Sequence, residues 1–182
     1  TKPGFPNYGI APGSLFVVFG TELGPAGLQQ AGSYPYPTSL SGTSMRVTVG
    51  STVVDAILVY TSATQAAAVL PSNTPAGIAL LAVTYQGRTS ESGAFRVLRS
   101  APGLLTLSET GSGPALAENF NSTADQPRNG FTHAARPGQV VTLWGTGLGP
   151  ITGDDAATPV PQDLNVNVQV IVGGKAAVVR YK

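Results

Sequence analysis

The chain has 182 residues and a net charge of +1, and only 10% of its residues are charged, against about 25% in a typical domain. Lys and Arg are scattered without a basic cluster, which excludes the electrostatic footprint of a nucleic-acid-binding protein. The absence of cysteine excludes disulfides and cysteine-based metal sites, and the apolar runs are too short to span a bilayer.

Short β-branched and aromatic runs follow one another along the first hundred residues, and Gly, Pro, Ser or Asn separates each run from the next. The one helix-like stretch, residues 65–70, is short and is stopped by Pro71. Turn signals at this spacing are typical of a sandwich or barrel. We therefore predict an all-β fold with strands over residues 14–19, 44–49, 56–60, 78–85 and 94–98.

The second half of the sequence repeats the first. Residues 12–25 and 137–150 lie 125 positions apart, since Pro12 matches Pro137, and both prolines and all three glycines of the first segment coincide with those of the second without a gap. Further on, residues 47–50 match residues 170–173. A match of this length, with glycines in register, indicates an internal duplication.

Both copies contain the motif Gly-Thr-x-Leu-Gly-Pro directly after an apolar strand. Glycines permit a sharp turn there, and we expect the leucine, Leu23 in the first copy, to pack under the sandwich. The alternative is a glycine-rich phosphate cradle, which needs a following helix and usually a lysine. Pro25 and Pro150 follow directly and no helix pattern appears, so the structural interpretation is favoured.

These motifs, together with residues 36–40, 60–65 and 69–71, resemble the TIG/IPT immunoglobulin-like domains. More closely, they resemble an uncharacterised repeat domain frequent at the C-termini of large acidobacterial secreted proteins. The resemblance covers nearly the whole chain and implies two tandem immunoglobulin-like β-sandwich modules, of which the second is incomplete. It implies no activity, because this family offers no catalytic or binding residues to carry over.

We expect a first sandwich in residues 1–100, and a linker hairpin with a second, truncated sandwich in residues 101–182. The second copy stops one residue after Tyr181, which matches Tyr60, so it lacks a counterpart of residues 61–98. Those residues supply three strands in the first copy.

Residues 164–172 are predicted to form one long alternating strand. Such a strand must bury its apolar face, and in the second copy the strands that would help to bury it are absent. We expect a cleaved C-terminal piece, residues 1–8 of a neighbouring copy, or another part of a neighbouring copy to cover it, the last two by head-to-tail β-strand addition. The rival interpretation is a truncation with a frayed or rearranged half-module. The face consists of Leu164, Val166, Val168, Val170 and Val172.

No catalytic, cofactor-binding or metal site is predicted. His133 is the only histidine, and no Gly-x-Ser-x-Gly elbow accompanies it. Asp154 and Asp155 are adjacent in a loop, where a solvated tip is more common than a calcium site. Tyr34 and Tyr36, in an aromatic-proline loop, are the candidate platform for a sugar ring, and the alternative is that they seal the loop.

The sequence therefore predicts a non-enzymatic structural or adhesive module, secreted or on a bacterial cell surface, without a cofactor. One form of this hypothesis is a subunit of a surface fibre that assembles by inter-chain β-strand addition. The alternatives are a carbohydrate-binding accessory module, with polysaccharide as the partner, and an enzyme fragment. Other protein chains, copies of the same chain or a cleaved C-terminal piece are the expected partners, and nucleic acid is not.

Overall fold

The computed structural model describes residues 9–160, 164 and 166–182, so residues 1–8, named above as a strand donor, lie outside the described part. The described residues form strands and no helix, which confirms the all-β prediction. They therefore include no helix that is long and apolar enough to cross a membrane. The chain divides into two compact units, Thr1–Ala101 with Gly147–Lys182, and Pro102–Thr146. This division differs from the predicted one, which placed residues 147–182 with the second module.

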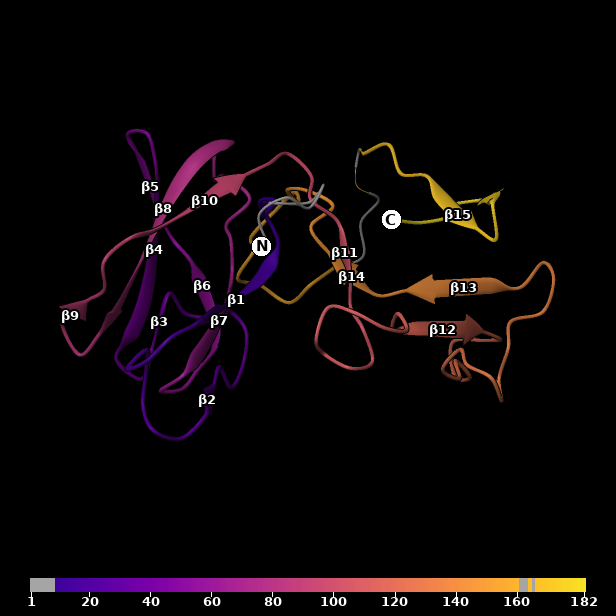
Figure 1. Cartoon of the computed structure of the whole chain (residues 1–182), viewed down its shortest axis with the longest axis horizontal. Helices are drawn as coiled ribbons and strands as arrows, with labels where there is room; N and C mark the ends of the chain where they lie inside the picture. Colours follow the sequence, from indigo (N-terminus) through magenta and orange to yellow (C-terminus); the bar gives the residue numbers. More distant parts are fainter. Residues whose placement is uncertain (1–8, 161–163, 165) are drawn as a thin grey trace. The chain divides into compact units, whose positions relative to one another are not determined.

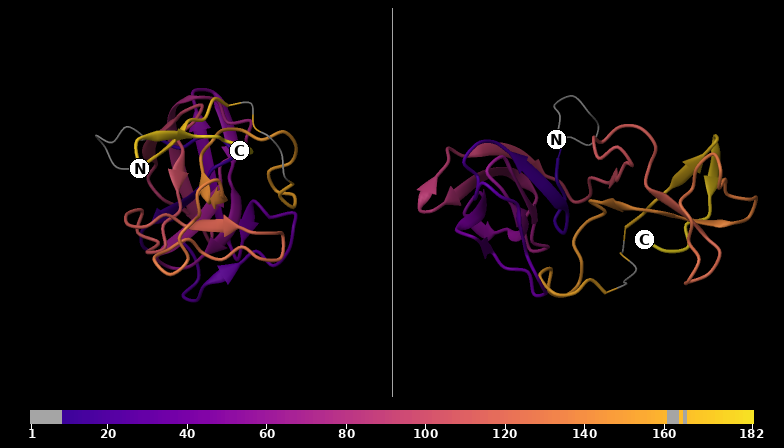
Figure 2. Two further views of the ribbon diagram at one scale, coloured as in Figure 1. Left: turned by 90° about the vertical axis from the view of Figure 1, so that its right-hand side faces the viewer. Right: turned by 90° about the horizontal axis from the view of Figure 1, so that it is seen from below.

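Two antiparallel β-sheets form a sandwich in the first unit (Figure 1). Further views of their strands, coloured indigo to magenta, are given in Figure 2. One sheet has the order β1 (Leu15–Phe19), β7 (Gln65–Val69), β6 (Ile57–Thr61), β2 (Gln29–Gln30). The other has the order β10 (Gly93–Val97), β8 (Gly77–Tyr85), β4 (Thr43–Val49), β3 (Ser39–Leu40), with β5 (Thr52–Asp55) paired to β4 and β9 (Arg88–Thr89) to β8.

The core of the sandwich lies between the two sheets and follows the alternation read from the sequence. On β4, Met45 and Val47 are fully buried, while Arg46 is exposed and pairs with Asp55 of β5 at 3.2 Å. The other sheet contributes Leu58, which is also fully buried. The period of two along each strand thus sends apolar side chains inward and polar ones outward.

Strand β7 occupies the stretch that most resembled a helix in the sequence. It pairs with β1 on one side and with β6 on the other, so it is an interior strand. Its three alanines, residues 66–68, are completely buried. Small side chains suit a strand that is covered on both faces, and this tertiary packing overrides the helix propensity of alanine.

The Gly-Thr-x-Leu-Gly-Pro turn of the first copy packs as predicted. Leu23 is only 7% exposed and belongs to the core cluster. Its carbonyl oxygen accepts a hydrogen bond from the buried Thr43 Oγ1 at 2.9 Å, and Thr43 Oγ1 lies 3.0 Å from Thr61 Oγ1. A Cβ at Gly24 would collide with Thr61 Oγ1, so this turn requires glycine there.

The duplication is visible in the local structure of the second copy. β13 (Val140–Leu143) stands 125 positions after β1, and the turns before them carry matching hydrogen bonds, Ser14 N to Ala11 O and Gln139 N to Arg136 O. The β4–β5 hairpin recurs 123 positions later, where residue 173 matches residue 50, as β15 (Val170–Val172) with β16 (Lys175–Ala177). Homologous sequence thus yields the same turn and hairpin in both copies.

The strands in the described residues of the second copy do not join into larger sheets like those of the first copy. They pair as three two-stranded sheets: β11 (Gly103–Leu104) with β14 (Gly145–Thr146), β12 (Ala117–Phe120) with β13, and β15 with β16. In the first copy, β1 pairs with β7 and β4 with β8, whereas their counterparts β13 and β15 pair with β12 and β16. The tandem sandwich arrangement therefore stays a prediction.

The second unit, Pro102–Thr146, is organised around a polar residue. Asn119 is its one buried residue, and the Asn119 side chain donates to the carbonyl oxygen of His133 at 2.6 Å. Its Oδ1 accepts from Asn129 Nδ2 at 2.8 Å. A unit whose buried centre is an amide has little apolar burial to stabilise it.

The two copies of the turn give a matched test of the leucine. We expect Leu23→Ala to lower the free energy of unfolding by about 2–5 kcal/mol, because it leaves a cavity in the core. Leu148→Ala is the control and should cost less, because Leu148 is only half-buried. Urea unfolding of both variants measures the difference, and equal losses would contradict the assigned role of Leu23.

Candidate functional site

The predicted strand face of the second copy is only partly in a strand. β15 begins at Val170, and the described residues between Leu164 and Gln169 have no regular structure, so the long strand predicted from residue 164 is wrong there. Leu164 N instead donates to Lys182 O at 3.1 Å, and Val166 N to Leu164 O at 2.8 Å. A strand of this length is stable only with a partner along it, and β16 covers three residues.

The burial along this segment still alternates. Leu164, Val166, Val168 and Val170 are half-buried. Residues 167 and 169, between them, are exposed. Val172, at the end of the face, is 67% exposed. Of the five predicted residues, Val172 is thus the one that is largely accessible to solvent, and the other four are partly covered.

Tyr34 and Tyr36 form a stacked pair with ring centroids 4.3 Å apart and an interplanar angle of 17°. The peptide bond between Tyr34 and Pro35 is cis. Tyr34 is 41% exposed, whereas Tyr36 is half-buried and its backbone N donates to Ala156 O at 2.8 Å. A hydrogen bond with Tyr36 raises the pKa of the Tyr34 hydroxyl above its ordinary value. Each ring hides one face of the other, so the pair offers a sugar one outer face and not a two-ring platform.

Asp155 anchors its loop to the first sandwich and is not a solvated tip. Its carboxylate accepts hydrogen bonds from Ser72 N at 2.7 Å and from Ser72 Oγ at 2.6 Å. Ser72 Oγ in turn accepts from Ile151 N at 2.9 Å. Asp154 has a local role, since its Oδ1 accepts from Ala156 N. Sequence reasoning missed this contact because the two partners are 83 residues apart and no local pattern links them.

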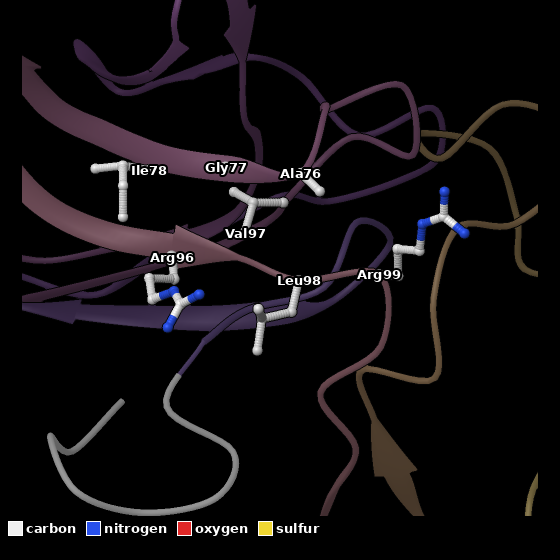
Figure 3. A pocket seen from close by; sticks show the side chains of 7 residues that line it. All are labelled: Ala76, Gly77, Ile78, Arg96, Val97, Leu98 and Arg99. Atoms are coloured by element: carbon white, nitrogen blue, oxygen red, sulfur yellow. The ribbon is translucent and has the colours of Figure 1, made fainter.

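A shallow hollow lies at the end of β8 and β10, and its side chains are drawn in Figure 3. In that view the guanidinium groups of Arg96 and Arg99 lie on either side of Leu98. The lining provides no carboxylate, imidazole or hydroxyl group, so it holds no candidate nucleophile or general base. The residues that line it are Ala76, Gly77, Ile78, Arg96, Val97, Leu98 and Arg99.

His133 lies in an exposed loop of the second unit, where its Nδ1 is 3.0 Å from Thr132 Oγ1. The described part of the chain contains no group of three or more His, Cys, Asp or Glu side chains that could hold a metal ion. His133 therefore lies in a surface loop that is held in place by hydrogen bonds of its backbone.

The Asp155 contact predicts a local loss of stability on mutation. Asp155→Ala removes a charged acceptor of two hydrogen bonds, so we expect the loop contact to weaken by about 1–3 kcal/mol. Hydrogen exchange of the Ser72 and Ile151 amides should become faster. Asp154→Ala, which leaves both amides paired, is the control, and the same exchange rates in the two variants would contradict this role of Asp155.

Comparison of the chain with protein-family models, with curated proteins and with solved structures finds no match.

Proposed function

We propose that this chain is a non-enzymatic structural or adhesive module that joins protein chains through the exposed strands of its second copy. The observation that carries the proposal is the difference in solvent exposure between equivalent residues of the two copies. Val47 and Val49 of β4 are 0% and 9% exposed, whereas Val172, the counterpart of Val49, is 67% exposed. An apolar strand that is buried in one copy and accessible in the other is available for pairing with another chain.

Other apolar side chains of the second copy support the same interpretation. Val141 and Leu143 of β13 are exposed, although the equivalent strand β1 is held in a four-stranded sheet. Large exposed apolar surfaces mark contact sites more often than they mark monomers. Further exposed side chains in this copy are Trp144, Ile171, Val178 and Tyr181.

The composition favours a place outside the cell. Lysine occurs only at residues 2, 175 and 182, and Ser, Thr and Gly carry much of the polarity. This composition is typical of extracellular bacterial β modules. The proposed setting is therefore a secreted or surface-bound bacterial protein, in which the module contributes shape and strand edges and no chemistry.

Self-association tests the proposal directly. Sedimentation equilibrium of the full chain should give a mass above the 18.5 kDa of one chain as concentration rises. Val172→Lys should weaken this association at least about tenfold, because it places a charge on the apolar face. Val53→Lys, at an exposed position of β5, is the matched control and should associate normally. A wild-type chain that stays at the mass of one chain at every concentration would contradict self-association.

Carbohydrate binding is a second candidate, because a stacked aromatic pair with one exposed ring lies on a surface loop. An aromatic face of this kind can stack on a sugar ring. If it does, Tyr34→Ala should abolish a glycan-array signal, whereas Tyr85→Ala, outside this loop, should keep it. Equal signals from the wild type and the Tyr34 variant would remove this candidate.

A further inference from the structure

The β15–β16 hairpin reproduces the geometry of the β4–β5 hairpin. Val49 pairs with Thr52 across the first turn, and Val172 pairs with Lys175 across the second. The glycine that follows the first strand, Gly50 or Gly173, has a φ of 57° in both. Each residue of β15 therefore has a defined counterpart on β4. The contacts of that counterpart in the first copy indicate which contacts the β15 residue can make.

In the first copy, the edge of β4 that faces away from β5 is covered by β8. The two strands pair antiparallel along the whole of β4, with Val47 opposite Leu81 and Val49 opposite Ala79. This pairing, with the opposite sheet packed on its inner face, leaves Val47 and Val49 buried. β8 is thus the main partner of β4 within its sheet.

In the second copy, β15 has β16 on one side, and no strand of the described residues pairs with its other edge. Backbone amides and carbonyls along a strand point alternately to its two sides, so an edge without a partner exposes every second residue's hydrogen-bonding groups. The apolar side chains next to that edge include Val172, which is largely exposed. The edge that β8 covers in the first copy is therefore without a strand partner here, and the face beside it is accessible at Val172 and partly covered at Val170.

We infer that the outer edge of β15 is an acceptor for a strand with the chemistry of β8, supplied by another protein chain. The inference rests on the proposed function and specifies its contact. The incoming strand runs antiparallel to β15, is uncharged, and alternates small and branched apolar residues as Gly77–Tyr85 does. By the register of the first copy, its equivalent of Ala79 lies opposite Val172 and its equivalent of Leu81 opposite Val170.

A peptide of residues 76–86, made soluble by two added lysines, is the probe. In the full chain, β4 is already paired with its own β8, so the peptide should bind β15 and not the first sandwich. Hydrogen exchange of the amides of residues 166–172 should slow at least about tenfold on saturation. A peptide of scrambled order and one with Pro at position 82, which cannot complete the ladder, are the controls.

Register is tested by disulfide cross-linking, which the absence of cysteine from the chain makes specific. Val172→Cys in the full chain should cross-link with a peptide that carries Cys at position 79 when oxidised glutathione is the oxidant. The thiol pair is oxidised to a disulfide, and glutathione disulfide is reduced. A peptide with Cys at position 80, whose side chain points to the other face, should cross-link at least about fivefold less.

Three outcomes would overturn the inference: no protection by the peptide, equal protection by the scrambled peptide, or cross-linking that ignores register. If the chain self-associates in sedimentation while the peptide fails, the contact lies elsewhere and the structural role stands. If the peptide binds in register while the chain alone stays a single chain, the acceptor edge is established and self-association is wrong.

Discussion

The pairing of β4 with β8 is the interaction on which the first sandwich depends. β8 joins β4 to β10, and the other edge of β4 holds β3 and β5, so one pair of strands connects the whole sheet. The inner face of that pair carries Met45, Val47 and Val83, against which the opposite sheet packs. Without β8, strand β4 would lose the backbone hydrogen bonds along one edge, and its buried apolar side chains would lose part of their cover.

The same dependence explains why the sequence predicts the first copy better than the second. Strands over residues 44–49 and 78–85 were recognisable from alternation and composition, and each found its partner within the first hundred residues. Residues 164–172 show an equally clear pattern, yet of those that the structure describes only Val170–Val172 form a strand. The alternation of apolar and polar residues predicts which face of a strand must be buried. It does not show whether a partner strand is present.

Other features lay beyond any local pattern. The hydrogen bonds between Asp155 and Ser72 depend on which loops meet in space, and a carboxylate in a Gly, Thr and Ala loop gives no sign of that. The stacking of Tyr34 on Tyr36 could be suspected from their spacing, but its effect on the exposed ring faces could not. The Gly-Thr-x-Leu-Gly-Pro motif shows the opposite case. Its glycines and leucine specify a turn, and the burial of Leu23 follows from the turn itself.

The recurrence of one hairpin in two settings also bears on the order of events in folding. β15–β16 keeps the register of β4–β5 although no strand resembling β8 lies beside it among the described residues, so the turn alone fixes that register. A hairpin with a two-residue turn closes in about 1–10 µs, whereas pairing β4 with β8 must first close the loop from residue 50 to residue 76. Because loop closure costs entropy, we expect the local β4–β5 contact to form more readily during folding than the contact between β4 and the distant strand β8.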